Sequence, residues 1–120
     1  MMPKKTIDIG NISSKQANVI ILEILSLIKD FGQIEYINWP YEDLSVDDIF
    51  RYLKMMYYDE FLKNDFIKHF INELNKKKQY STIEGFFSLI KYFEHEERYE
   101  DCLLLKNIKD HLLYDMESSH

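Results

Sequence analysis

Glycine and proline are scarce in this sequence, with three glycines and two prolines among 120 residues. Tight turns depend on these two residue types, so the many turns of a β-sandwich or a β-barrel have little to be built from. Hydrophobic residues make up 46% of the chain, and over long stretches they recur at steps of three and four, as along one face of a helix. The sequence therefore predicts an all-α protein, a small bundle of four to five helices that ends in an antiparallel helical hairpin.

The length of the chain fits one domain. We expect residues 1–13 to form an N-terminal arm that could be extended, and residues 14–116 to form a single helical domain. Residues 117–120 are expected to be a frayed C-terminal tail. The single cysteine, Cys102, excludes an internal disulfide and a zinc site built from several cysteines.

The first helix of the domain is expected to begin after a cap at Ser13 or Ser14 and to end near Gly32. Its main apolar stripe consists of Ala17, Ile20, Ile21, Ile24, Leu25, Ile28 and Phe31. Leu22 and Leu27 lie off this stripe, so the helix is apolar around most of its circumference. Such a helix either lies at the centre of the bundle or meets a partner on its second side.

The stretch from Gln33 to Leu44 is the least helical part of the chain, because Pro40 disfavours helix at the preceding Trp39. Large apolar residues are unusually frequent in it, namely Ile34, Tyr36, Ile37, Trp39 and Tyr41. A loop of this composition either folds back onto the core or forms a contact surface.

Helical spacing returns over residues 46–77, after a capping signal made by Ser45 and Asp48. No glycine or proline interrupts this stretch. The sequence therefore allows two alternatives, either one long helix or two helices with a bend near Asp59.

Ser81 and Glu84 form another capping box, which predicts the start of a further helix. Gly85 lies inside that helix and could allow a second helix to approach closely. A final helix is expected from about Tyr99 to Tyr114, which gives the hairpin at the end of the bundle.

No catalytic constellation is recognisable in the sequence. The three glycines are far apart and match no phosphate-binding loop, and no two of the four histidines have the helical spacing of a zinc site. His95 stands among Glu94, Glu96 and Glu97, which predicts a solvated acidic connector because adjacent residues point in different directions. Cys102 lies on an apolar helix face and is expected to be a small buried hydrophobe. We expect no enzymatic activity, no metal and no cofactor.

The chain carries 15 basic and 21 acidic residues, a formal net charge of −6. Nucleic acids require several cations on one surface, so this balance disfavours them as partners. The amphipathic helices carry mixed or acidic polar faces, which disfavours binding to a membrane surface. Neither a signal peptide nor a long apolar run is recognisable, so we expect a cytoplasmic location. The abundance of Lys, Ile, Asn and Tyr is typical of AT-rich bacterial or phage genomes.

One short pattern lies near the end of the chain, where Tyr99-Glu100 are followed by Cys102 and then by Leu105-Lys106. This order resembles the UVR motif, a helical hairpin of bacterial excision-repair proteins and of some Clp-protease regulators. In that family an aromatic–Glu pair opens the second helix, two small residues follow, and a Leu precedes a basic residue. The family's hairpin docks other proteins, so the resemblance implies partner binding and not a repair activity.

The resemblance covers residues 91–106 and has three departures from the family pattern. Leu103 replaces the second small residue, Asn107 stands where an acidic residue is expected, and Ile108 arrives one position early. The residues alone offer a different interpretation, in which the same positions belong to the core of a closing helix. These core positions are Tyr99, Cys102, Leu105 and Ile108.

Taken together, these features favour a non-enzymatic protein–protein interaction module, an adaptor or assembly protein that could self-associate through its first helix or the Trp39 loop. The contact residues expected for this function are Ile21, Leu22, Tyr36, Trp39 and Tyr41. The alternative is an acidic inhibitor or immunity-type protein that neutralises a basic enzyme or toxin. Its contact residues would be Glu94, Glu96, Glu97, Glu100 and Asp101, joined by Glu42, Asp43, Asp47 and Asp48. A phage structural component is a third option.

Overall fold

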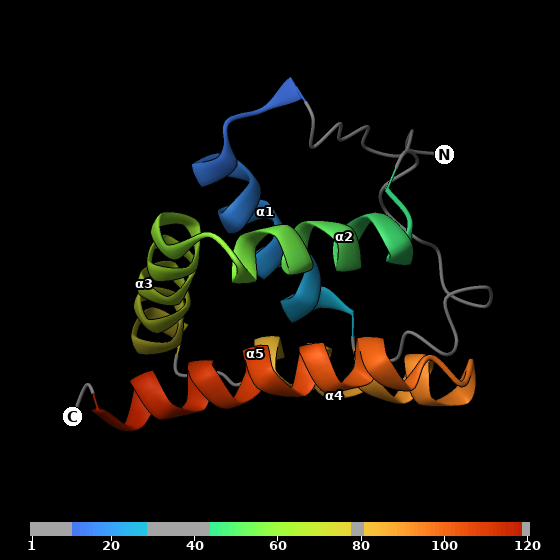
Figure 1. The fold of residues 1–120 in the computed structure, drawn as a ribbon. Coiled ribbons are helices and arrows are strands. Elements are labelled where there is room, and N and C mark those ends of the chain that lie inside the picture. The colour runs from blue at the N-terminus through green and yellow to red at the C-terminus, as the bar shows by residue number, and fades with distance from the viewer. Residues whose placement is uncertain (1–10, 29–43, 78–80, 119–120) are drawn as a thin grey trace, which may run out of the picture.

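The computed structural model describes residues 11–28, 44–77 and 81–118 (Figure 1). Within these ranges the chain forms five α-helices and no strand. The helices are α1 (Ser14–Leu27), α2 (Val46–Tyr57), α3 (Glu60–Lys77), α4 (Ser81–His95) and α5 (Tyr99–Ser118). The predicted all-α fold is confirmed.

The first helix, α1, is the central element of the bundle. It packs against both α3 and α4, while α2 packs against α3 and α4 packs against α5. Figure 1 shows α4 and α5 side by side as an antiparallel hairpin, with α5 in front in orange to red. The Cα radius of gyration is 13.9 Å, close to the value of about 14 Å expected for a compact domain of this length. The predicted hairpin and the central position of the first helix are both observed.

Two capping boxes fix the starts of α1 and α2. The Ser13 hydroxyl accepts a hydrogen bond from the backbone N–H of Gln16 at 3.2 Å, and the Gln16 side chain accepts one from the backbone of Ser13. Ser45 and Asp48 make the same reciprocal pair, again at 3.2 Å. Both boxes satisfy backbone donors that the first helical turn leaves free. The helix expected after Tyr80 begins at Ser81, whose side chain is outside what the structure describes.

Residues 46–77 form two helices, which settles the alternative left open by the sequence. α2 ends at Tyr57, and α3 begins at Glu60 after Tyr58 and Asp59. The Asp59 carboxylate accepts a hydrogen bond from the backbone N–H of Leu62 at 3.0 Å, as the cap of a new helix does. The break therefore depends on a capping side chain, and glycine or proline is not needed.

Two predicted helix ends are wrong. α1 ends at Leu27, and Ile28 is already extended (φ −99°, ψ 112°), so the helix stops several residues before Gly32. α5 continues to Ser118, beyond the expected end at Tyr114 and into the segment expected to fray. Residues 1–10 of the predicted arm, Gly32 and most of the Trp39 loop lie outside the described residues.

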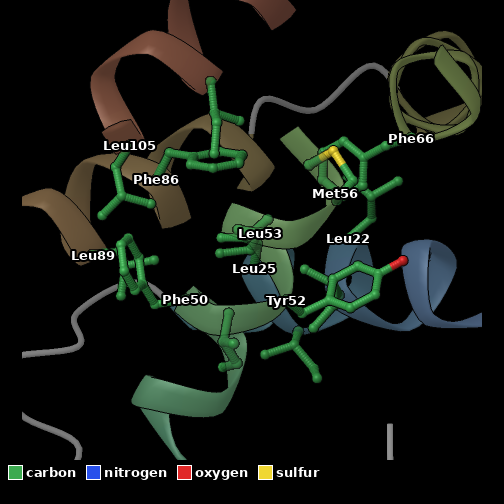
Figure 2. Packing of buried hydrophobic residues seen from close by; sticks show 14 of the residues in the cluster. Leu22, Leu25, Phe50, Tyr52, Leu53, Met56, Phe66, Phe86, Leu89 and Leu105 are labelled. Atoms are coloured by element: carbon green, nitrogen blue, oxygen red, sulfur yellow. The ribbon is translucent and has the colours of Figure 1, made fainter. Parts of the chain in front are cut away.

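The core joins all five helices around α1. Figure 2 shows Leu25 of α1 and Leu53 of α2 near the middle, with Phe86 of α4 and Leu105 of α5 on one side. Each of these four side chains is fully excluded from solvent. Burial of aliphatic and aromatic groups of this size contributes about 1.5–3 kcal/mol each, which is the main source of stability in a small bundle.

At Gly85 the backbones of α1 and α4 approach each other closely. A Cβ atom built on Gly85 would lie 2.2 Å from the backbone carbonyl oxygen of Leu25 and 2.9 Å from its carbonyl carbon. Only a residue without a side chain allows the two backbones to meet here. The close approach predicted from Gly85 is confirmed, and it fixes how the α4–α5 hairpin sits on the central helix.

Candidate functional site

The two contact residues expected on the first helix are buried inside the chain itself. Ile21 is 0% and Leu22 3% exposed, because α3 and α4 cover both sides of α1. A partner cannot reach them in this fold, so their assignment as a contact surface is wrong. Tyr36, Trp39 and Tyr41 of the predicted loop surface lie outside the described residues.

The turn between α4 and α5 has the geometry of a Schellman motif. The backbone N–H of Arg98 donates to the carbonyl of Phe93 at 2.8 Å, and that of Glu97 donates to the carbonyl of Glu94 at 3.0 Å. Glu97 adopts a positive φ of 60°, which no other non-glycine residue of the described chain does. An L-residue with a Cβ is strained in this left-handed region. The motif reverses the chain within Glu96–Arg98 and places the start of α5 beside the end of α4.

Arg98 ties this turn to the start of α2. Its guanidinium donates to Asp101 at 2.7 Å and to Asp47 at 2.6 Å. It also lies over the ring of Phe93, 4.1 Å from the centroid, and near the ring of Phe50 at 5.6 Å. Burial acts to lower the pKa of Arg98, but the hydrogen bonds with the two carboxylates outweigh it and raise the pKa. The turn is therefore held by an ion-pair and cation–π clamp between helices far apart in sequence.

The predicted acidic surface is divided by this clamp into paired and unpaired carboxylates. Arg98 forms ion pairs with Asp47 and Asp101. Asp101 was expected to contact a partner, but its carboxylate is already paired within the chain. Glu94 pairs with Lys106 at 3.5 Å. Glu96, Glu97 and Glu100 are exposed, and among the described residues no ion pair includes them. These three were predicted together, and the turn gathers them at one end of the hairpin. Glu42 and Asp43 lie outside the described residues.

Beside these carboxylates, a shallow groove on the hairpin exposes two large hydrophobic side chains. Tyr99 is 66% and Leu103 61% exposed, one turn apart on α5. The groove is lined by Glu94, Tyr99, Cys102, Leu103 and Lys106. We call Glu96, Glu97, Tyr99, Glu100 and Leu103 the hairpin face. It combines exposed apolar area with carboxylates for which the described residues supply no ion pair.

The core interpretation of α5 is correct for three positions and wrong for the fourth. Cys102, Leu105 and Ile108 are buried, as that interpretation requires. Tyr99 precedes Cys102 by three residues but lies on the exposed side of the helix. Leu103 was noted in the sequence only as a departure from a motif. A helical projection centred on Leu105 and Ile108 would have placed Tyr99 and Leu103 on the opposite side.

A second group of exposed apolar side chains lies at the corner between α2 and α3. Met55 is half exposed, Tyr58 more so, and Phe61 is 89% exposed. Tyr58 packs edge-on against Tyr57, with ring centroids 5.4 Å apart. We call Met55, Tyr58 and Phe61 the corner patch.

A buried polar cluster that sequence reasoning missed joins α1, α2 and α3. Asn18 is fully buried, and its amide donates to the carbonyl of Leu62 at 3.1 Å and to Asp65 at 3.0 Å. The Tyr52 hydroxyl lies 2.5 Å from the Asn18 side-chain oxygen and 2.8 Å from the carbonyl of Ser14. Burial, followed by the charges of Asp65 and Asp59, raises the pKa of Tyr52 to about 12. Because the polar atoms of Asn18 and Tyr52 have partners, the cluster fits a role in specifying the packing of three helices.

The remaining candidates for chemistry are structural or absent from the described residues. Burial raises the pKa of the Cys102 thiol, and the charge of Glu94 adds to this effect. The thiol donates to the carbonyl of Ile90 at 3.4 Å, so it behaves as a packed hydrophobe. Across 11–28, 44–77 and 81–118, no three His, Cys, Asp or Glu side chains are grouped as metal ligands would be. In the same ranges no helix combines the length and apolar character needed to cross a membrane.

No known protein family, curated protein or solved structure matches this chain.

Proposed function

We propose that this protein is a non-enzymatic protein-binding module that contacts its partner through the hairpin face. The observation that supports this proposal is the exposure of Tyr99 and Leu103 along the hairpin groove, close in sequence to three exposed carboxylates that have no ion pair among the described residues. Exposed aromatic and aliphatic groups of this kind are typical anchors of protein interfaces. The expected cytoplasmic location belongs to the same proposal.

The preference for the hairpin face over the corner patch rests on shape and charge. Tyr99 and Leu103 line a groove in which a partner side chain can be seated. The carboxylates beside it add direction to an otherwise non-directional apolar contact. The resemblance of residues 91–106 to the UVR hairpin favours the same element, because that family's hairpin docks proteins. The corner patch is more exposed, but its side chains project at a turn and no described groove accompanies them.

A second candidate function is inhibition of a basic enzyme or toxin. It is favoured by the exposure of Glu96, Glu97 and Glu100 at one end of the hairpin. Because these carboxylates have no ion pair within the described part of the chain, they can pair with lysine and arginine of another protein without breaking a described contact. The two candidates use the same face and differ in whether the captured partner loses an activity.

The proposal is tested by affinity capture from cells of the source organism, with the full chain as bait. The hairpin variant, Tyr99→Gln with Leu103→Gln, removes the apolar part of the face. The corner variant, Tyr58→Gln with Phe61→Gln, removes a matched pair of exposed apolar groups elsewhere. Both pairs are exposed, so circular dichroism and thermal unfolding should show that both variants fold.

We expect one partner in stoichiometric amount with the wild type and the corner variant, and about tenfold less with the hairpin variant. Loss of the partner with the corner variant alone would move the site to the α2–α3 corner. A partner retained equally by all three baits would contradict the proposed face. An activity assay of the captured partner, with and without the protein, separates an adaptor from an inhibitor.

A further inference from the structure

Three exposed apolar side chains of α5, among those described, lie on one side of the helix, which we call the stripe; Lys106 and Asp110 lie between Leu103 and Tyr114 on that side. Tyr99, Leu103 and Tyr114 are 66%, 61% and 69% exposed. They are spaced by four and eleven residues, close to one and three helical turns, so they share one face. Leu105, Ile108 and Leu112 occupy the opposite face and are buried in the core. Within the described chain, nothing packs over this stripe as the core packs over the other face.

The dimensions of the stripe match those of a second helix. From Tyr99 to Tyr114 the helix rises about 22 Å, the length of a partner helix of about 15 residues. Tyr99 and Leu103 have the i, i+4 spacing by which one amphipathic helix lies against another, and Tyr114 returns to the same side about three turns further along. An extended strand places its side chains in alternation, so it would match this stripe poorly.

The described charges around the stripe differ between the hairpin turn and the middle of α5. Glu96, Glu97 and Glu100 lie at the turn end without ion pairs among the described residues. Lys106 and Asp110, further along the same face, are each paired within the chain, with Glu94 and Lys109 respectively. Among the described side chains, the uncompensated charge beside the stripe is therefore negative and lies at the Tyr99 end. A complementary partner must present lysine or arginine there.

A second copy of this chain fits the stripe poorly in the antiparallel pairing of α5 with α5. A two-fold arrangement of α5 against α5 that matches Tyr99 with Tyr114 centres on Lys106 and Asn107. It would bring the two Lys106 side chains together and place Leu103 against Asp110 of the other copy. Both contacts are unfavourable, because like charges repel and a carboxylate loses water against an apolar surface.

We infer that the stripe receives a basic amphipathic helix of a different protein, with its apolar side chains on Tyr99, Leu103 and Tyr114. This inference rests on the proposed function and specifies the chemistry of the partner. The basic residues of that helix face Glu96, Glu97 and Glu100 at the hairpin turn.

The test uses synthetic peptides of about 18 residues, or about 27 Å as a helix. The probe contains Leu at helical spacing and Lys elsewhere, and carries a fluorophore for anisotropy measurements with the full chain. One control peptide has the same composition with Leu and Lys in strict alternation. A second keeps the helical spacing but replaces Lys by Glu.

Four variants locate the binding. The hairpin variant removes the apolar part of the surface. A triple variant that combines Glu96→Gln, Glu97→Gln and Glu100→Gln removes the charged part. The corner variant is the control for the hairpin variant. The control for the charge variant combines Glu23→Gln, Glu60→Gln and Glu84→Gln, because it changes the net charge equally at exposed positions on other helices.

We expect the helical Lys peptide to bind and both control peptides to bind at least about tenfold more weakly. The two surface variants should weaken binding about tenfold, and their matched controls less than about twofold. Affinity should fall between about 0.1 M and about 1 M salt, where the Debye length shortens from about 10 Å to about 3 Å.

Failure to bind the helical peptide, or equal losses in both triple variants, would overturn the inference. If capture from cells still depended on Tyr99 and Leu103, the proposed function would stand with a partner of other chemistry. Light scattering tests whether a second copy of the chain occupies the stripe. A dimer of the wild type that is lost in the hairpin variant would identify a second copy as the occupant and overturn the basic helix.

Discussion

At the scale of single residues, the position that departs most from ordinary backbone geometry is Glu97. Its φ of 60° is required by the Schellman motif, in which Arg98 N–H reaches the carbonyl of Phe93. Glycine is the usual residue at this position because it has no Cβ to be strained. A glutamate kept here contributes negative charge to the hairpin face at a cost in stability.

The strain at Glu97 gives a prediction with a defined sign. Glu97→Gly should raise the free energy of unfolding by about 1 kcal/mol, because glycine adopts positive φ without strain. Denaturant unfolding of the two proteins measures the change. Glu96→Gly is the control, since it removes the same charge at a neighbouring position where φ is not positive. Stabilisation of both variants by equal amounts would assign the effect to charge, and a less stable Glu97→Gly would show that the residue is not strained.

Sequence reasoning reached part of this residue-scale detail and missed the rest for identifiable reasons. Capping side chains act within four residues of themselves, so Ser45 was recognisable, and Ser13 was one of two candidates with Ser14. Asn18 was not, because its partners Tyr52 and Asp65 are distant in sequence. The sequence around a buried amide does not show its hydrogen-bond partners when these come from distant helices.

At the scale of elements, the crossing of α1 and α4 depends on the absence of one side chain. The Cβ of any other residue at position 85 would lie only 2.2 Å from the carbonyl oxygen of Leu25. The atoms that this Cβ would meet belong to the backbone of the last turn of α1, and they cannot move aside as the end of a flexible side chain can. The hairpin is thus seated on the central helix by a direct contact between backbones.

Gly85→Ala tests this contact because two effects of opposite sign compete. In an open helix the change would stabilise the protein by about 1 kcal/mol through helix propensity. The clash with Leu25 should instead destabilise it by about 3 kcal/mol, at the upper end of overpacking costs. Thermal and denaturant unfolding measure the balance. Lys91→Ala, at an exposed position of the same helix, should change stability by less than about 0.5 kcal/mol. A more stable Gly85→Ala variant would contradict the close crossing.

The elements themselves were well predicted, and their boundaries less so. Apolar residues at steps of three and four identified the helices, because each helix buries one face in the core. The early end of α1 at Leu27 was missed, since Ile28 and Phe31 continue the helical apolar spacing up to Gly32. The exposure of Tyr99 was also missed. An apolar residue at helical spacing was assigned to the core, but this one lies on the outer face of α5.

At the scale of the whole molecule, the fold converts a sequence of mixed charge into one face with uncompensated negative charge. The start of α2 and the α4–α5 turn are about 50 residues apart, and Arg98 joins them through Asp47 and Asp101. Two carboxylates are thereby neutralised, while Glu96, Glu97 and Glu100 beside them stay without a described partner. The sequence predicted an acidic cluster here, but the division into paired and unpaired members depends on a contact between distant helices.

Removal of the Arg98 side chain should therefore affect stability and binding in opposite directions. Arg98→Gln deletes two charge-assisted hydrogen bonds and the contact with the Phe93 ring, all of them partly exposed to solvent. We expect a loss of about 2 kcal/mol in the free energy of unfolding, after allowance for solvent screening. The same change releases Asp47 and Asp101, so the helical Lys peptide should bind the folded variant more tightly at low salt and equally at high salt. Combining Arg98→Gln with Asp47→Asn and Asp101→Asn separates the two effects, because neutral partners should remove the gain in affinity without restoring the clamp. Weaker peptide binding by the folded Arg98→Gln variant would instead show that Arg98 positions the hairpin face for its partner.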